Sequence, residues 1–231
     1  MDSASAGSRP TQSAWYHSSH VSHATITAFG DNVNEWQHLV DEAKKDKHVV
    51  GAAPYIEREG MLQAKRISGA MIRGVLPEME NTVSEVGAST HEGRFELLEA
   101  GSYRIVLGAE LAHTLGVNLG DNVTLMAPQM RATPVGVIPQ MRRFKVVGIF
   151  EVGMYEYDRG FAFIHMTDAA KLFREGDGVT GVRLKLDDMF RAWSVAQDLT
   201  TRLDGLYSVR DWTQQHSNFF RAVQTEKLVM F

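Results

Sequence analysis

The spacing of apolar residues predicts a strand–helix–strand unit near the start of the chain. The unit has a strand over 23–29, a helix over 34–47 and a second strand over 48–62. From Trp36 onward, apolar residues recur at i, i+3, i+4 and i+7, which places them on one helix face. Asn32 or Asn34 is the expected N-cap of this helix. Pro54 indicates a bulge or an edge position in the second strand.

A second strand–helix–strand unit is predicted near the other end. It has a strand over 181–188, a helix carrying apolar residues from Phe190 to Leu203, and a strand over 206–212. Asp187 or Asp188 is the expected helix cap. More than a hundred residues separate the two units. Two such units with a long insertion between them are typical of a ferredoxin-like half whose chain has been interrupted.

The insertion has a mixed pattern of its own, so the predicted fold class is α+β. The expected elements are a strand pair or one bent strand over 63–76, strands over 104–108, 122–127, 143–152 and 154–165, and helices over 109–117 and 167–175. Gly116 is expected to end the first of these helices, while Thr167 and Gly176 are expected to bound the second. The polar, acidic stretch 77–93 is interpreted as a mobile loop with at most one helical turn.

The stretch 128–143 is unusual because it combines prolines, apolar residues and basic residues. It holds three of the six prolines in the chain, and no acidic residue occurs between Asp121 and Glu151. Proline cannot donate a hydrogen bond within a central strand, so this stretch predicts a long, stiff connection between two strands. A stiff basic and apolar finger suits docking onto another protein, because little ordering entropy is lost on binding. The alternative is a hairpin loop packed against its own domain.

Composition narrows the functional classes. The chain has a formal net charge of −4 and only a short basic stretch, which does not indicate nucleic-acid binding. It has no cysteine, which excludes disulfides, a thiol nucleophile and cysteine-type zinc sites. The chain contains no run of 18 apolar residues, so the sequence predicts no membrane span. Residues 1–22 lack the apolar segment of a signal peptide, and we expect them to be a tag or linker without fixed structure.

The sequence contains no motif of a known catalytic site. A P-loop, a nucleophile elbow and a zinc-protease helix are all missing, so we predict no enzymatic activity and no cofactor. The histidines His17, His20 and His23 lie in or beside a serine-rich stretch and are expected to be solvated rather than to bind metal. Glu156 and Asp158 are interpreted as solvent-facing carboxylates, and His216 as structural. The eleven methionines are interpreted mainly as core residues, with an adaptable lipid-facing surface as the alternative.

Several segments together resemble one protein family. They are SGAMIRGVLPE (68–78), IVLGAELAHTLGVNLGDNVTLMAP (105–128), RRFKVVGIFEVGMYEYDRGFAFIHMTDAAKLF (142–173), VTGVRLKLDD (179–188) and DWTQQHSNFFRAVQTEK (211–227). They resemble the extracytoplasmic domain of LolC- and LolE-type lipoprotein-releasing ABC transporter subunits, within the MacB-type superfamily. The resemblance covers approximately residues 23–231.

The resemblance implies an architecture and a cellular role. It implies a porter-like subdomain over 23–70 and 179–231, and an inserted Sabre-like subdomain over 71–178. Such a domain lies on the periplasmic side of the bacterial inner membrane, between membrane-spanning helices. The implied partners are the periplasmic chaperone LolA, the ATPase subunit LolD, a second LolC-, LolE- or LolF-type subunit, and triacylated lipoproteins as cargo.

The resemblance also assigns roles within the finger. Residues 128–141 match a proline-bearing hairpin, the hook, which in LolC inserts into LolA. The hook residues are Arg131, Thr133, Pro134, Val135, Gly136, Val137, Ile138 and Pro139. The neighbouring pad, which makes polar contacts, corresponds to Thr124, Met141 and Arg142. Of these three, only Arg142 matches LolC by residue type, so Arg131 or Arg143 is the candidate for the missing charge.

Three functions follow as hypotheses. The first is a non-enzymatic docking domain for LolA, in a LolC-like or LolF-like subunit, because LolE-type subunits lack the proline-bearing hook. The second is a MacB-type domain that transmits mechanical strokes to an efflux adaptor or exit duct. The third, which has the least support, is a substrate-sensing or adhesion module with a ligand pocket.

Overall fold

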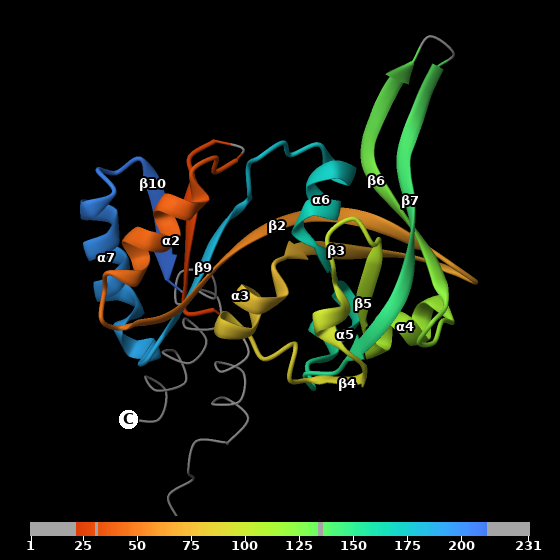
Figure 1. Cartoon of the computed structure of the whole chain (residues 1–231), viewed down its shortest axis with the longest axis horizontal. Helices are drawn as coiled ribbons and strands as arrows, with labels where there is room; N and C mark the ends of the chain where they lie inside the picture. Colours follow the sequence, from red (N-terminus) through yellow and green to blue (C-terminus); the bar gives the residue numbers. More distant parts are fainter. Residues whose placement is uncertain (1–21, 31, 134–135, 212–231) are drawn as a thin grey trace, which may run out of the picture.

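The structure is a computed structural model that describes residues 22–30, 32–133 and 136–211, and over 129–133 and 136–139 it describes the backbone. Within these residues, ten strands form one mixed sheet with helices packed on it (Figure 1). The strand order is β10-β1-β9-β2-β3-β8-β5-β7-β4, and β6 pairs with β2 and β7. The predicted α+β class is therefore confirmed. The segment 1–22, predicted to be a tag or linker, lies outside the described residues except for Ser22.

The two predicted strand–helix–strand units interleave in one part of this sheet. Their elements are β1 (Ala24–Ala28), α2 (Trp36–Lys44), β2 (Val49–Gln63), β9 (Gly181–Leu186), α7 (Ala192–Arg202) and β10 (Tyr207–Asp211). Strand β9 lies between β1 and β2 and is antiparallel to both, while β1 lies between β9 and β10 and is antiparallel to both. Each unit is thus split by a strand of the other, as in ferredoxin-like topology.

The remaining elements come from the long segment between β2 and β9. They are β3 (Ile67–Val75), α3 (Pro77–Val83), β4 (Thr90–Gly93), η1 (Phe95–Leu97), β5 (Arg104–Gly108), α4 (Ala109–Leu115), β6 (Asn122–Thr133), β7 (Gly136–Phe150), α5 (Tyr155–Gly160), β8 (Phe161–His165) and α6 (Met166–Phe173). A short helix, η2 (Met189–Arg191), precedes α7.

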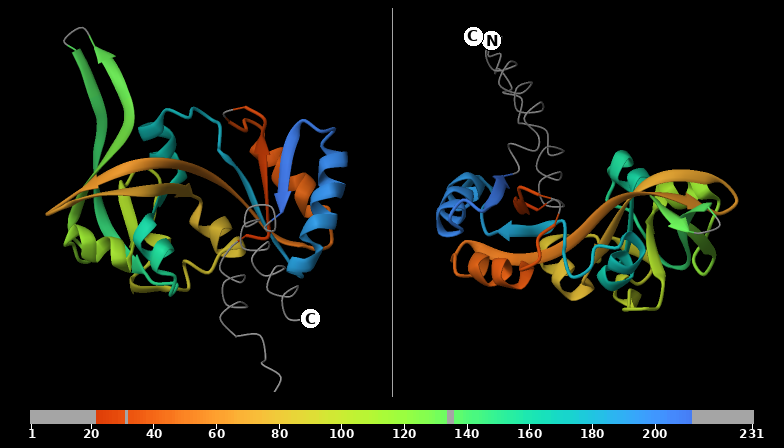
Figure 2. Two further views of the ribbon diagram at one scale, coloured as in Figure 1. Left: turned by 180° about the vertical axis from the view of Figure 1, so that it is seen from behind. Right: turned by 90° about the horizontal axis from the view of Figure 1, so that it is seen from above.

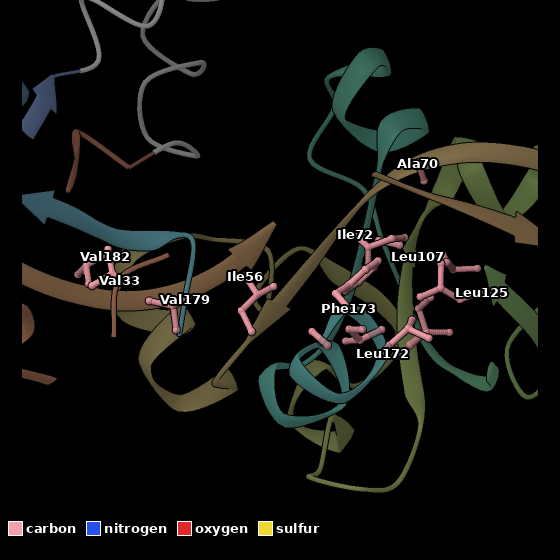
Figure 3. Packing of buried hydrophobic residues seen from close by; sticks show 14 of the residues in the cluster. Val33, Ile56, Ala70, Ile72, Leu107, Leu125, Leu172, Phe173, Val179 and Val182 are labelled. Carbon is pink, nitrogen blue, oxygen red and sulfur yellow. The ribbon is translucent and has the colours of Figure 1, made fainter. Parts of the chain in front are cut away.

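The larger of two apolar clusters runs through both parts of the sheet, and the smaller one gathers around Phe95, Phe150 and Phe163. The larger cluster includes Val33 and Val182 of β9 in one part, and Leu107 of β5 and Leu125 of β6 in the other (Figure 3). Strand β2 passes from one part to the other, pairing with β9 first and with β6 at its end. Because core and sheet are continuous, the division into porter-like and Sabre-like subdomains remains a prediction.

The stretch 77–93 is not the mobile loop that its polar sequence predicted. Pro77 lies in the first turn of helix α3, a position that does not need its missing N–H. The helix buries Val83 and, against expectation, Glu80. Strand β4 then adds to β7 at the edge of the sheet. The prediction failed because an acidic residue such as Glu80 normally indicates an exposed position. Its burial depends on a partner, Arg183, that lies 103 residues away in the sequence.

The stretch 154–165 is a helix followed by a strand rather than one strand. Helix α5 occupies its first half because Asp158 is buried and closes the preceding turn. The Asp158 carboxylate accepts hydrogen bonds from the backbone N–H groups of Val152 (2.9 Å) and Gly153 (3.1 Å). The interpretation of Asp158 as a solvent-facing carboxylate is therefore wrong.

The predicted helix ends were partly right. The left-handed Gly116 ends α4, with φ 70°, as expected. Asp188 accepts a hydrogen bond from the N–H of Phe190 (2.9 Å) and so caps η2, directly before α7. By contrast, α2 begins after Glu35 without a capping side chain, so neither predicted asparagine caps it. Helix α6 is capped at its start by the ring of His165 rather than by Thr167, and its C-cap is the left-handed Arg174 rather than Gly176.

Candidate docking hairpin

Strands β6 and β7 form a hairpin that extends beyond the rest of the sheet (Figures 1 and 2). The pairing runs from Asn122 and Lys145 at the base to Thr133 and Gly136 at the far end. Strand β6 also pairs with β2, but only through its residues 124–126. Beyond this point each strand of the hairpin has one unpaired side.

The prolines lie within this hairpin rather than in a long loop between two shorter strands. Pro128 falls at a register shift, where β6 holds two more residues between Ala127 and Met130 than β7 holds opposite. Pro139 lies in β7 opposite Met130. Proline is tolerated at bulges and on strands with a free side, so these positions do not interrupt the pairing. The two predicted strands, one ending at 127 and the other beginning at 143, were therefore too short.

The predicted hook residues occupy the far part of the hairpin. Pro134 and Val135 lie outside the described residues. The backbones of Arg131, Thr133, Gly136, Val137, Ile138 and Pro139 belong to the paired strands. Their side chains lie outside the described part of the chain, so the hook roles stay predictions.

The base of the hairpin is anchored to helix α6 and to the core. With its amide oriented to satisfy both ends, Gln140 donates to the carbonyl oxygen of Leu172 (3.1 Å) and accepts from the guanidinium of Arg174. Nearby, Phe144 of β7 is fully buried and packs edge-on against Tyr103, with ring centroids 5.6 Å apart. These contacts fix the direction in which the hairpin leaves the sheet.

The predicted pad residues lie on two different faces of the hairpin. Residues opposite one another in an antiparallel pair point to the same face. Met126 pairs with Met141 and Thr124 pairs with Arg143, so these four residues share the outer face. Leu125 is buried and pairs with Arg142, so Arg142 belongs to the other face. There its guanidinium lies 5.6 Å from the ring centroid of Tyr103.

The register identifies Arg143 as a member of the outer face that includes two pad positions. Arg143 is exposed and stands directly across from Thr124. Among the described residues, no carboxylate forms an ion pair with Arg142 or Arg143. Both charges are therefore available to a partner. The sequence named Arg143 only as one of two substitutes, because which face it occupies depends on the register.

A buried ionic cluster beside the junction of the two parts was not predicted from sequence. Glu80 of α3 is fully buried and pairs with Arg183 of β9. Arg73 of β3 donates to Glu57 (2.7 Å) and to the hydroxyl of Tyr157 (3.1 Å). Burial alone would raise the pKa of Glu80, but the guanidinium groups of Arg183 and Arg73 outweigh it and hold that pKa below its ordinary value. Burial raises the pKa of the Tyr157 phenol.

This cluster is structural, since each of its charged side chains has a charged partner within the fold. A second clamp lies nearby, where both carboxylate oxygens of Glu175 lie 2.8 Å from guanidinium nitrogens of Arg58. Asn32, the wrongly predicted cap, donates to the same carboxylate (2.6 Å). The chain returning from α6 to β9 is thereby attached to β2.

The other candidate sites contribute little chemistry. His23 is buried, and its ring Nδ1 accepts a hydrogen bond from the N–H of Leu186 (3.0 Å), so the prediction that it is solvated is wrong. His17, His20 and His216 lie outside the described residues. Within residues 22–211, apart from the gaps given above, no group of three or more potential metal ligands gathers. Across the same residues, no helix has the length and apolar character needed to span a bilayer.

Comparison with known families places this fold. Residues 6–202 match the model of the MacB-like periplasmic core domain. The chain belongs to this family. The fold alone is also similar to the periplasmic region of MacB from Actinobacillus actinomycetemcomitans, with a TM-score of 0.55, 14% identity, and coverage of 86% of this chain and 92% of that one. The extracellular domain of the transporter YknZ from Gram-positive bacteria gives a TM-score of 0.54 at 11% identity, covering 82% and 99%.

Within the family, the sequence is similar to LolC. It is 49% identical over 210 residues to the lipoprotein-releasing system transmembrane protein LolC of Xylella fastidiosa strain 9a5c, covering 91% of this chain and 51% of that protein. For LolC of Neisseria meningitidis the identity is 37%, covering 90% and 51%. LolE of Haemophilus influenzae is 24% identical, covering 91% and 52%. The chain therefore spans about half the length of these relatives, and the resemblance to the LolC and LolE periplasmic domain is confirmed.

Proposed function

We propose that this chain is the periplasmic domain of a lipoprotein-releasing transporter subunit, and that it docks the carrier LolA through the hairpin β6–β7. In this proposal the chain hydrolyses no ATP itself, and a separate LolD subunit supplies that activity. A second LolC-, LolE- or LolF-type subunit completes the transporter, which transfers triacylated lipoproteins from the inner membrane to LolA. The similarity to proteins named as parts of lipoprotein-releasing systems supports this role.

The observation that carries the docking proposal is the projecting hairpin with a fixed base (Figure 1). Gln140 and Phe144 hold that base, so the hairpin loses little conformational freedom when it is bound. Val137 and Ile138 lie near its far end, in a stretch without acidic residues. An apolar end can enter the apolar cavity of a carrier without leaving buried polar side chains unpaired.

The arginines at the root of the hairpin supply orientation. Arg142 and Arg143 lie on opposite faces, so they can contact carboxylates on both sides of a cavity mouth. Hydrogen bonds between guanidinium and carboxylate groups are charge-assisted and are stronger than neutral ones. An acidic rim on the carrier is therefore part of the proposal.

Isothermal titration calorimetry, in which purified LolA is added to this chain, tests the proposal. We expect Arg142→Glu and Pro134→Gly each to weaken binding by at least about tenfold, since a charge reversal and a loosened hairpin end affect the centre of the interface. Arg210→Glu is the matched control, because Arg210 is an exposed arginine on β10, far from the hairpin. Wild-type affinity in both hairpin variants, with folding intact, would refute docking through this hairpin.

A second candidate is a MacB-type domain that transmits mechanical strokes to an adaptor or exit duct. The rigid junction favours it, because Arg58–Glu175 and Glu80–Arg183 join the two parts of the chain by ion pairs. The fold shared with the periplasmic region of MacB agrees with such a role. This candidate predicts no binding to LolA, so the same titration separates the two functions.

A further inference from the structure

One face of the sheet beside the hairpin carries a row of exposed and half-exposed methionines. Strand register places Met61 of β2 opposite Met126 of β6, and Met126 opposite Met141 of β7, so three methionines form a row across three strands. On the same face, Met71 lies opposite Glu59 and Ile67 lies opposite Gln63. We call Met61, Ile67, Met71, Met126 and Met141 the methionine face.

The methionine face is exposed because the covering helix stops short of it. Further along the sheet, α5 packs over the same side, and Tyr157 stacks on Phe161 with ring centroids 4.3 Å apart. Phe161 is the register neighbour of Met71, and beyond this pair the described residues provide no cover. Met61 is 48% exposed, Ile67 57% and Met141 49%. The core residues Leu62 and Leu125 point to the opposite side and are fully buried.

A groove of about 690 Å³ runs along this face and is open on one side. Its lining is mostly apolar and contains one carboxylate, and it consists of Gly60, Gly69, Ala70, Ala127, Gly160, Met61, Met71, Met126, Pro128 and Glu59. Methionine is flexible and polarizable, so such a surface adapts to apolar shapes of a binding partner. An apolar patch of this kind marks an interaction site.

We infer that the methionine face is a second docking surface, and that it binds an apolar ridge bordered by carboxylates on the same carrier that takes the hairpin. This inference rests on the proposed function. Met141 belongs both to the methionine face and to the predicted pad, so the two surfaces are continuous. Beside it, Arg143 and Lys145 are exposed on the same face, and an acidic border on the partner would complement them.

The geometry favours a protein ridge over the other possible occupants. A lipid acyl chain gains most when it is enclosed on nearly all sides, whereas this groove is open along one side. A second copy of the chain would bring Arg143 and Lys145 of each copy against a face whose carboxylates on β2 are Glu57 and Glu59. Glu57 is already paired with Arg73. Like charges at such a contact are unfavourable.

Calorimetric titration with LolA tests the inference. Met61→Glu and Ile67→Glu replace half-exposed side chains, so the fold is retained, and Leu206→Glu is the control because Leu206 is 69% exposed and lies next to β10. We expect each of the first two variants to bind LolA at least about tenfold more weakly and the control to bind as the wild type does. Wild-type binding by both variants, while Arg142→Glu loses binding, would overturn this inference and leave the hairpin proposal standing. Wild-type binding by all three would overturn both.

Methyl NMR on protein with ¹³C-labelled methionine methyl groups identifies the occupant. We expect LolA to shift the signals of Met61, Met126 and Met141 and to leave those of Met79, which lies on α3, unchanged. The same shifts produced by palmitoyl-lysophosphatidylcholine alone, below its micelle concentration, would instead show an acyl-chain site. Shifts that grow with the concentration of the chain alone would show self-association. Either of these two results would overturn the inference.

Discussion

The buried pair Glu80–Arg183 provides the most quantitative test of how the two parts of the chain are held together. Glu80 has no exposed surface, and the side chain of Arg183 is 6% exposed. Removing one partner of such a pair leaves the other charge buried without compensation, which typically costs about 3–5 kcal/mol. We expect Glu80→Gln to lower the free energy of unfolding by this amount. Exposed pairs such as Arg202–Asp198 contribute less than about 1 kcal/mol, so Asp198→Asn is the control.

Urea denaturation followed by circular dichroism measures both variants. The double variant Glu80→Leu with Arg183→Met removes both charges and keeps much of the volume, so we expect it to be more stable than Glu80→Gln. A loss below about 1 kcal/mol in Glu80→Gln would refute the reasoning. So would a double variant that is less stable than Glu80→Gln.

The pair also makes a prediction about pH. The pKa of Glu80 in the folded protein lies below the ordinary value of 4.5 because Arg183 and Arg73 outweigh the effect of burial. A carboxyl whose pKa falls on folding stabilises the protein fully above its unfolded pKa, and this stabilisation is lost as the pH falls through the folded pKa. The wild-type protein should therefore lose stability below about pH 4.5, and Glu80→Gln should lose less over the same range.

Two further predictions concern the supports of the hairpin. Asp168 is fully buried and accepts hydrogen bonds from the N–H groups of Gly101 (2.8 Å) and Tyr103 (3.1 Å). Asp168→Asn should cost about 1–3 kcal/mol in urea denaturation, because one N–H loses its acceptor; a loss below about 0.5 kcal/mol would contradict this. Gln140→Ala removes the contact with Leu172, so it should weaken LolA binding severalfold while costing less than about 1.5 kcal/mol of stability. Unchanged affinity would show that this contact does not orient the hairpin.

Strong periodicity made much of the fold predictable. The helix from Trp36 and the alternating strand over 181–186 carry one clear apolar face each, and both formed as expected. The interleaved pairing followed from the presence of two such units. Helix α3 was missed because its buried face includes Glu80, whose burial depends on a distant arginine. Helix α5 was missed because the Asp158 carboxylate is buried and accepts hydrogen bonds from nearby backbone N–H groups, whereas the sequence suggested that it faces solvent.

The candidate site was only partly predictable, because its faces depend on register. The sequence identified the proline-bearing segment, its basic residues and its possible role. It placed Arg142 with Met141 in one pad, but adjacent residues of a strand point to opposite faces. The methionine face was equally hidden, since Met61, Met126 and Met141 are brought together only by the pairing of three strands. Their spacing in the sequence shows no pattern.

The central claim is that the hairpin is the part of the chain that contacts the carrier. Site-specific photocrosslinking tests it most directly, with p-benzoylphenylalanine placed at Val137 in β7 and, as a control, at the exposed Leu206. On irradiation with LolA, we predict a covalent adduct from position 137 and none from position 206. An adduct from position 206 with none from position 137 would contradict the claim.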